Sequence, residues 1–208
     1  MQKNEMLAKG LVLPIMEEFY SIQGEGFNTG KAAYFIRIGG CDLGCNWCDV
    51  KESWNSRYHP ITTIEKIVEN VVESPAKAVV ITGGEPLTYK LGPLCLELKN
   101  KGIEIFLETS GAYPFSGIFD WVCVSAKRQA PPLKEMLAVA DELKIIVFEL
   151  EDFAWAEANK NYVRKGCRLF LQPEWSRRNE MLPKIIEYVK LHPEWMVSLQ
   201  THKYMNIP

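Results

Sequence analysis

The sequence contains no run of about 18 apolar residues, which is the length that a helix needs to cross a bilayer. The first ten residues are mostly polar and lack the apolar segment of a signal peptide. We therefore expect a cytoplasmic protein without a membrane partner. Thiols stay reduced in the cytoplasm, so structural disulfides are not expected either.

The chain also lacks a strong charge of either sign. Its formal net charge is −2 and its pI is near 6.0, so no broad basic surface points to a nucleic-acid partner. No internal repeat, low-complexity tract or linker interrupts it. With 208 residues, of which 47% are apolar and 24% charged, it is expected to form one domain over residues 1–208.

Cysteine is scarce, yet three of the six cysteines fall within eight residues, as Cys41-x3-Cys45-x2-Cys48. A structural zinc site takes four protein ligands, and no fourth Cys or His follows at the usual distance. Three thiolates fit an iron–sulfur cubane that leaves one iron open. The spacing favours this cluster and leaves zinc or ordinary thiols as alternatives. The remaining cysteines are expected to be plain apolar residues: Cys95, Cys123 and Cys167.

Short apolar runs alternate with amphipathic stretches along the chain. Strands are predicted at 13–20, 33–38, 77–81, 103–107, 121–124, 143–147, 168–171 and 195–199. Helices are predicted near 64–71, after an N-cap at Thr62 or Thr63, and at 91–101, 132–140, 151–160 and 180–191. Six to eight such strands predict an α/β fold with a mostly parallel sheet, either doubly wound or a barrel short of its full set.

Polar and glycine-rich residues follow the predicted strands. Ligands of parallel α/β folds gather at the carboxyl ends of strands, so this shared placement favours one binding face over ordinary loop residues. The residues concerned are Gly39 and Gly40 with the cysteines, the turn Thr82-Gly-Gly-Glu85, Glu108 and Thr109, Ser125 and Lys127, and Gln172.

Arg37 interrupts an otherwise apolar strand, and a buried arginine is rare without a partner. The position predicts either a fork for a substrate carboxylate or a structural salt bridge.

The cysteine motif, with Trp47 before its last cysteine, and Gly83-Gly-Glu-Pro86 together resemble the radical S-adenosylmethionine superfamily. This resemblance implies an incomplete TIM-type barrel. It also implies a 4Fe–4S cluster on the three cysteines, whose open iron is chelated by S-adenosylmethionine.

A narrower resemblance covers nearly the whole chain. The motifs are similar to those of the 7-carboxy-7-deazaguanine synthase family: Ser21-Ile-Gln-Gly-Glu-Gly26, Phe35-Ile-Arg37, Cys48-Asp49, Glu108-Thr-Ser-Gly111, Ser125-x-Lys127, Gln172-Pro173 and Gln200-Thr-His-Lys203. The resemblance implies a homodimeric lyase of queuosine and 7-deazapurine biosynthesis, reduced by flavodoxin or ferredoxin. It would convert 6-carboxy-5,6,7,8-tetrahydropterin to 7-carboxy-7-deazaguanine and ammonia.

The same resemblance implies which residues form the site. Those expected at the cofactor are Trp47, Asp49, Gly84, Glu85, Thr109, Ser125, Ala126, Lys127 and Gln172. Those expected at the substrate are Ile22, Gln23, Gly24, Glu25, Arg37, Thr82, His202 and, through its carboxylate, Pro208. Strand-end capping remains the alternative for Thr109 and Ser125, and an ordinary surface position remains the alternative for His202.

Two positions depart from the family pattern. The third cysteine is usually followed by Asp-Thr or Asp-Ser, whose hydroxyl binds Mg²⁺, but here the sequence is Asp49-Val50. A valine side chain offers no oxygen ligand, so either Mg²⁺ is absent or weakly bound, or water, Asp49 or another group replaces the hydroxyl. Activity without a strict Mg²⁺ requirement is expected. The usual Ser-Pro-Lys is Ser125-Ala126-Lys127 here, which keeps both polar residues.

Two rival functions remain open from the sequence. One is another small radical enzyme, such as an activase that makes a glycyl radical. The other is a zinc-stabilised domain without enzymatic activity. The turn around Gln23, together with Arg37 and His202, favours the pterin enzyme over the activase, and metal analysis would separate the zinc-stabilised domain from both.

Overall fold

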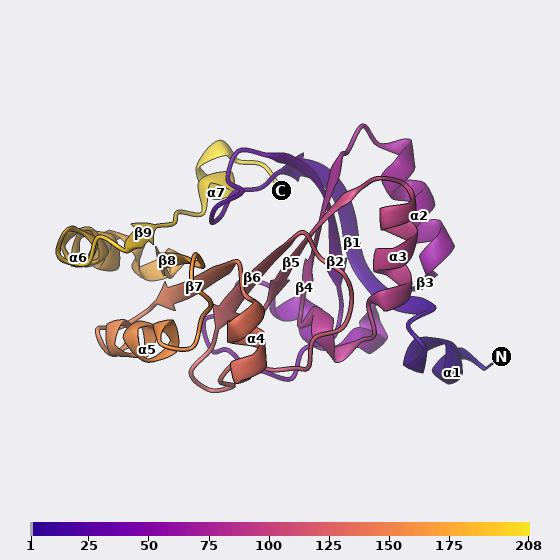
Figure 1. The fold of residues 1–208 in the computed structure, drawn as a ribbon. Helices are drawn as coiled ribbons and strands as arrows, with labels where there is room; N and C mark the ends of the chain where they lie inside the picture. The colour runs from indigo at the N-terminus through magenta and orange to yellow at the C-terminus, as the bar shows by residue number, and fades with distance from the viewer. Residues whose placement is uncertain (1) are drawn as a thin grey trace.

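The computed structural model describes residues 2–208, which are organised around one curved sheet of nine strands (Figure 1). The strands are β1 (Val12–Ile22), β2 (Ala32–Ile38), β3 (Ile61–Thr63), β4 (Ala78–Gly83), β5 (Glu104–Thr109), β6 (Trp121–Ala126), β7 (Glu142–Val147), β8 (Arg168–Pro173) and β9 (Trp195–Val197). Their order is β3-β1-β2-β4-β5-β6-β7-β8-β9, so the sheet has two free edges and the barrel stays open.

All neighbours from β2 to β9 are parallel, which confirms the prediction of a mostly parallel, incomplete barrel. The exception is β1, which pairs antiparallel with both β2 and β3. A turn rather than a crossover helix joins β1 to β2, and such a connection can only return the chain antiparallel.

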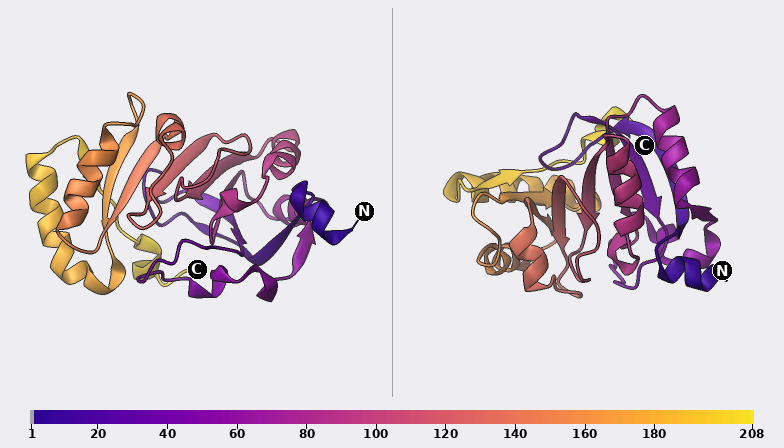
Figure 2. Two further views of the ribbon diagram at one scale, coloured as in Figure 1. Left: turned by 90° about the horizontal axis from the view of Figure 1, so that it is seen from below. Right: turned by 45° about the vertical axis from the view of Figure 1, so that its right-hand side comes forward.

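The helices are α1 (Lys3–Ala8), α2 (Ile64–Glu73), α3 (Gly92–Asn100), α4 (Lys134–Val139), α5 (Glu151–Lys160), α6 (Arg178–Leu191) and α7 (Thr201–Met205). Helices α2 to α6 line the outside of the curved sheet (Figure 2), whereas α7 lies beside the turn that follows β1. Helix α2 begins as predicted, because the Thr63 side chain accepts a hydrogen bond from the Lys66 amide. Its apolar face is buried against the sheet through Ile64, Ile67, Val68 and Val71.

The main core lies between the sheet and these helices, since successive side chains of a strand point to opposite faces. A second, smaller cluster faces the inside of the barrel and contains Ala33, Phe35, Ala78, Val80 and Phe106. Phe35 and Val80 of this cluster also border the open space at the carboxyl ends of the strands.

The strand count of six to eight was too low, because the three-residue strand β3 was not predicted. A segment that short shows no usable periodicity. The short helices α1 and α7 were missed for the same reason. Within residues 2–208, no helix has both the length and the apolar character needed to cross a membrane.

Candidate active site

A cavity of about 460 Å³ opens at the carboxyl ends of the parallel strands. This volume is typical of sites for small ligands. Its lining comes from the sheet, the cysteine loop (residues 41–50), the turn after β1 (residues 23–31) and the C-terminal segment (residues 198–208). The predicted site residues lie along its wall with the exception of Ala126, which is 4% exposed and faces the core instead.

The three cysteines of the motif are free thiols that line this cavity. The loop that carries them is anchored at its start, where the Gly40 amide donates to the Ser53 carbonyl at 2.6 Å and the Cys41 amide donates to the Trp54 carbonyl at 3.0 Å. Burial raises the pKa of the Cys41 thiol to about 11. Thiolates at this position therefore need a bound cation, which is what a metal centre provides.

The Gly83-Gly84 turn packs directly against the cysteine loop. Gly83 has φ +133°, and a Cβ on Gly84 would lie 2.2 Å from the Gly40 carbonyl oxygen. The Glu85 amide donates to that same oxygen at 2.9 Å. Only glycine fits such an approach, so this turn and the cysteine loop form one corner of the cavity.

The Glu85 carboxylate is 1% exposed and already accepts four hydrogen bonds. Their donors are the Leu87 amide at 3.0 Å, the Thr109 hydroxyl at 2.6 Å, and the Ser110 amide and hydroxyl at 2.8 and 2.5 Å. Glu85 thus links the end of β4 to the end of β5. The Thr109 hydroxyl is one of its donors, which is the strand-end capping role given above as the alternative for Thr109.

Ser125 and Lys127 form the next part of the wall. The Lys127 ammonium donates to the Ser125 hydroxyl at 2.7 Å and lies 5.2 Å from the centre of the Trp47 ring. Burial lowers the pKa of Lys127 from its ordinary value. Further along the sheet, the buried Gln172 side chain accepts a hydrogen bond from the Ser198 hydroxyl at 2.7 Å.

The turn after β1 and the C-terminal segment form the opposite wall, although they lie at the two ends of the sequence. The Thr201 amide and hydroxyl both donate to the Gly24 carbonyl at 2.9 Å. A Cβ on Gly24 would lie 2.3 Å from His202 Nδ1, so this imidazole packs on the turn. The Ser21 hydroxyl donates to the Pro208 carbonyl oxygen at 3.2 Å. His202 therefore lines the cavity and does not occupy an ordinary surface position.

Arg37 forms the salt bridge that the sequence raised as one of two alternatives. Its Nε donates to Glu17 Oε1 at 2.5 Å, which is a salt bridge. The side chain also lines the cavity, where the guanidinium keeps further donors.

Asp49, the residue before Val50, has a cationic partner in Lys203. The Lys203 ammonium lies 2.8 Å from Asp49 Oδ2, and Gln200 Nε2 lies 3.3 Å from the same oxygen. Although burial raises the pKa of Asp49, its hydrogen bond and charge pairing with Lys203 outweigh that effect and lower it.

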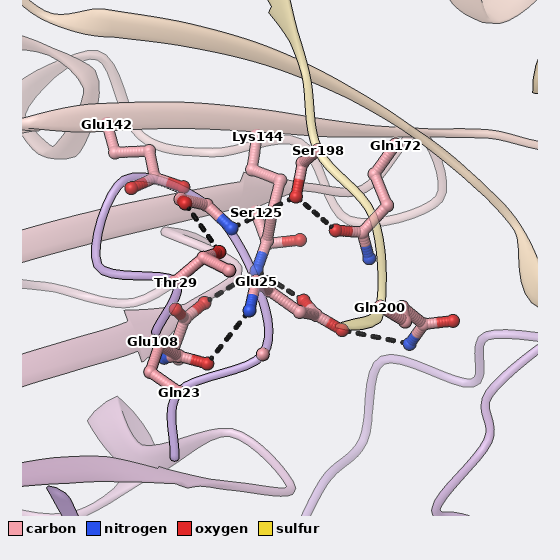
Figure 3. Close-up of polar contacts among 12 residues, drawn as sticks. Gln23, Glu25, Thr29, Glu108, Ser125, Glu142, Lys144, Gln172, Ser198 and Gln200 are labelled. Atoms are coloured by element: carbon pink, nitrogen blue, oxygen red, sulfur yellow. Dashed lines mark hydrogen bonds and ion pairs between the residues drawn. The ribbon is translucent and has the colours of Figure 1, made fainter. Parts of the chain in front are cut away.

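Several lining residues received no cofactor or substrate role from the sequence, among them Glu108, Lys144, Gln200 and Lys203. Lys144 lies between the carboxylates of Glu25 and Glu108 (Figure 3). The only signal for it was a single lysine within an otherwise apolar run at 143–147.

Comparison with known proteins agrees with this geometry. The family model "Radical SAM superfamily" matches residues 35–147. The chain is 55% identical over 200 residues to a 7-carboxy-7-deazaguanine synthase of Flavobacterium psychrophilum, covering 96% of this chain and 95% of that protein. It is 47% identical over 194 residues to a Synechocystis protein of the same name, covering 93% of each. The solved structure titled "Crystal structure of QueE from Escherichia coli" superposes with a TM-score of 0.82 at 29% identity, covering 95% of this chain and 98% of that one.

Proposed function

The chain belongs to the 7-carboxy-7-deazaguanine synthase family of the radical S-adenosylmethionine superfamily. From this membership we infer which of its residues bind the cluster, the cofactor and the substrate. It is a lyase of queuosine biosynthesis. It contracts the ring of 6-carboxy-5,6,7,8-tetrahydropterin to give 7-carboxy-7-deazaguanine and releases ammonia. The division of roles rests on one observation, that the cysteine loop, the Gly84 turn and the turn after β1 line one cavity.

Cys41, Cys45 and Cys48 would hold the 4Fe–4S cluster, because three free thiols on one loop face the cavity and none is used in a disulfide. When bound, the cluster and S-adenosylmethionine supply the radical chemistry of the ring contraction. The protein's contribution is to position the two ligands and to exclude water from the barrel.

S-adenosylmethionine would be held along the cysteine-loop side. The Gly84 turn lies beside Cys41 on the cavity wall, so its backbone carbonyl would accept from an ammonium, and Glu85 holds that turn in place. Lys127 supplies a point charge for a carboxylate. The polar or aromatic side chains that would line the rest of the cofactor are Trp47, Asp49, Thr109, Ser125 and Gln172, while Ala126 can contribute only through its backbone.

The pterin would lie against the opposite wall. The backbone of Ile22, Gln23 and Gly24 offers donors and acceptors to its flat edge. The ionised Glu25 carboxylate accepts from the amidine N–H groups. Thr82, His202 and the Pro208 carboxylate complete this half of the cavity.

Arg37 is assigned to the substrate carboxylate as a charged donor fork. We expect Arg37→Met to raise KM for the pterin by about 10- to 100-fold, the range expected when one charge-assisted hydrogen bond is lost. Steady-state kinetics under argon measures this effect. Glu17→Gln is the matched control, because it removes the salt-bridge partner of Arg37 and keeps the guanidinium. Equal KM values for the two variants would make Arg37 purely structural.

Mg²⁺ is where this chain departs from the family pattern, because Val50 lacks the hydroxyl and Asp49 is paired with Lys203. We expect removal of Mg²⁺ by chelation to change the turnover rate by less than about twofold, since Mg²⁺ binds through oxygen ligands that Val50 does not offer. Val50→Thr, which restores the hydroxyl, is expected to gain stimulation by Mg²⁺. A strong Mg²⁺ dependence of the wild-type enzyme that survives chelation controls would contradict this proposal.

The assignments of partner and location are also proposals. We propose one radical S-adenosylmethionine core domain over 1–208 that forms a homodimer and accepts electrons from flavodoxin or ferredoxin. A cytoplasmic location is supported by the free state of the cysteines, as expected of a reducing compartment.

The experiment that tests the function is an anaerobic assay of protein purified under argon. The purified protein should be brown and carry about four irons per chain. With reductant, S-adenosylmethionine and 6-carboxytetrahydropterin, we expect the deazapurine chromophore to form. Zinc in place of iron would point to a structural metal domain, and no product at full iron content would point to an activase.

A further inference from the structure

Lys144 is a buried ammonium in the middle of β7. Its side chain is 3% exposed, and Nζ lies 2.6 Å from Glu25 Oε2 and 3.0 Å from Glu108 Oε2 (Figure 3). A buried charge is costly unless it is paired and hydrogen-bonded. The two carboxylates supply that pairing, so all three charges depend on one another.

The two carboxylates come from different parts of the site. Glu25 belongs to the turn after β1, whereas Glu108 belongs to β5. The second oxygen of Glu25, Oε1, accepts from Gln200 Nε2 at 2.8 Å. The Glu25 carboxylate is thus held from one side by a rigid strand and from the other by the C-terminal segment.

The rest of the turn is fixed to the same region of the sheet. The Gly26 amide donates to the Ser198 hydroxyl at 3.0 Å, and the Phe27 amide donates to Glu142 Oε2 at 3.1 Å. Because these contacts hold the backbone, the Lys144 ammonium determines mainly where the Glu25 carboxylate points and whether it is charged.

Charged groups from several elements surround the pair of Lys144 and Glu25. They are Glu142 on β7, Glu108 on β5, Lys127 after β6, His202 on α7, and Asp49 on the cysteine loop. Burial raises the pKa of Glu25, but the Lys144 ammonium outweighs this effect and lowers it to about 2. Burial likewise lowers the pKa of Lys144, and the surrounding anionic groups, including Glu108 and Glu25, raise it well above its ordinary value. Both groups therefore stay charged across the physiological range of pH.

We propose that Lys144 is a positioning residue for the pterin: its ammonium holds the Glu25 carboxylate in the orientation and charge state that accept the amidine N–H groups of the substrate. The proposal deepens the proposed function and rests on its assignment of Glu25 to the pterin. Lys144 acts through Glu25, because an amidine presents donors for which an ammonium is no partner.

The test compares wild type, Lys144→Met, Glu25→Gln and the double variant, all loaded with the cluster. The measurement is KM for 6-carboxytetrahydropterin between pH 5.5 and 8.5, given as the ratio of variant to wild type so that titration of the substrate cancels. We expect Lys144→Met to raise KM by about 100-fold at the acid end, because a charge-assisted acceptor is lost. Without the ammonium, burial raises the pKa of Glu25, so the ratio should fall as pH rises and Glu25 ionises.

The double variant separates positioning from folding. It removes both opposite charges, and its KM should equal that of Glu25→Gln at every pH, because coupled residues are not additive. Iron per chain and circular dichroism report whether each variant folds. If Lys144→Met alone loses the cluster, the comparison of the double variant with Glu25→Gln carries the test.

Three outcomes would overturn the role of Lys144. They are a KM ratio that does not change with pH, a double variant more than about 10-fold worse than Glu25→Gln, and a double variant that also loses its cluster. Each would mean that Lys144 acts independently of Glu25. A wild-type enzyme that makes no product at full iron content contradicts the proposed function itself, so the two failures are distinguishable.

Discussion

Replacing Cys45 with alanine is expected to abolish product formation. Cys45 supplies one of only three thiols available to the cluster, and it lies buried beside Gln129, whose amide donates to its sulfur at 2.7 Å. Within residues 2–208, the only other cysteines that line the cavity are Cys41 and Cys48, which are needed as ligands themselves. With one ligand missing, we expect iron per chain to fall to a small fraction of the wild-type content and turnover to fall by at least about 10⁴-fold.

Cys167→Ala is the matched control. Cys167 is a free, partly buried cysteine that packs against the core and lies outside the cavity lining. Its replacement should leave iron content and turnover near those of wild type. Iron analysis, the visible spectrum and the rate of deazapurine formation measure both variants. A Cys45→Ala protein that keeps full iron and activity would contradict the cluster assignment.

Replacing Gly84 with alanine is expected to have the second largest effect. The new Cβ would lie 2.2 Å from the Gly40 carbonyl oxygen and 2.9 Å from Cys41 Cβ. The first of these atoms is backbone, so the clash can be relieved only by moving the turn away from the cysteine loop. A shift of about 1 Å between reacting groups costs on the order of 100-fold in rate, so we expect a loss of at least that size.

Gly92→Ala provides the control for this steric prediction. Gly92 begins helix α3, has no atoms within 4 Å of its added Cβ, and needs no left-handed backbone conformation. Alanine there should be neutral or slightly stabilising. Turnover, iron content and the change in the electron paramagnetic resonance spectrum of the reduced cluster on adding S-adenosylmethionine report the effects. Equal behaviour of the two variants would refute the close packing of Gly84.

The parts of the site that are local in sequence could be predicted from it. The cysteine motif places its ligands within eight residues, so chain connectivity alone brings Cys41, Cys45 and Cys48 together. The strand-end signals were also reliable, because parallel strands put their carboxyl ends at one edge of a sheet. The resemblance to the family then supplied the roles that spacing alone left open.

The partners of the buried charges could not be predicted in this way. Glu85 is local to its turn, but its donors Thr109 and Ser110 come from another strand. Lys144 appeared as one lysine in an apolar strand, and its pairing with Glu25 spans 119 residues of sequence. Which charges meet depends on how the sheet curves and which strands become neighbours, and no local pattern contains that information.

The sequence by itself therefore determined the chemistry of this protein and the βα order of its fold, because both depend on short-range spacing and hydrophobic period. The tertiary structure alone decided that β1 pairs with the distant strand β3 and that residues 21–24 join 201–208 in one wall of the cavity. It also decided that Lys144 lies between Glu25 and Glu108. The physical reason is that these contacts form between distant segments only after the sheet has curved and the core has packed.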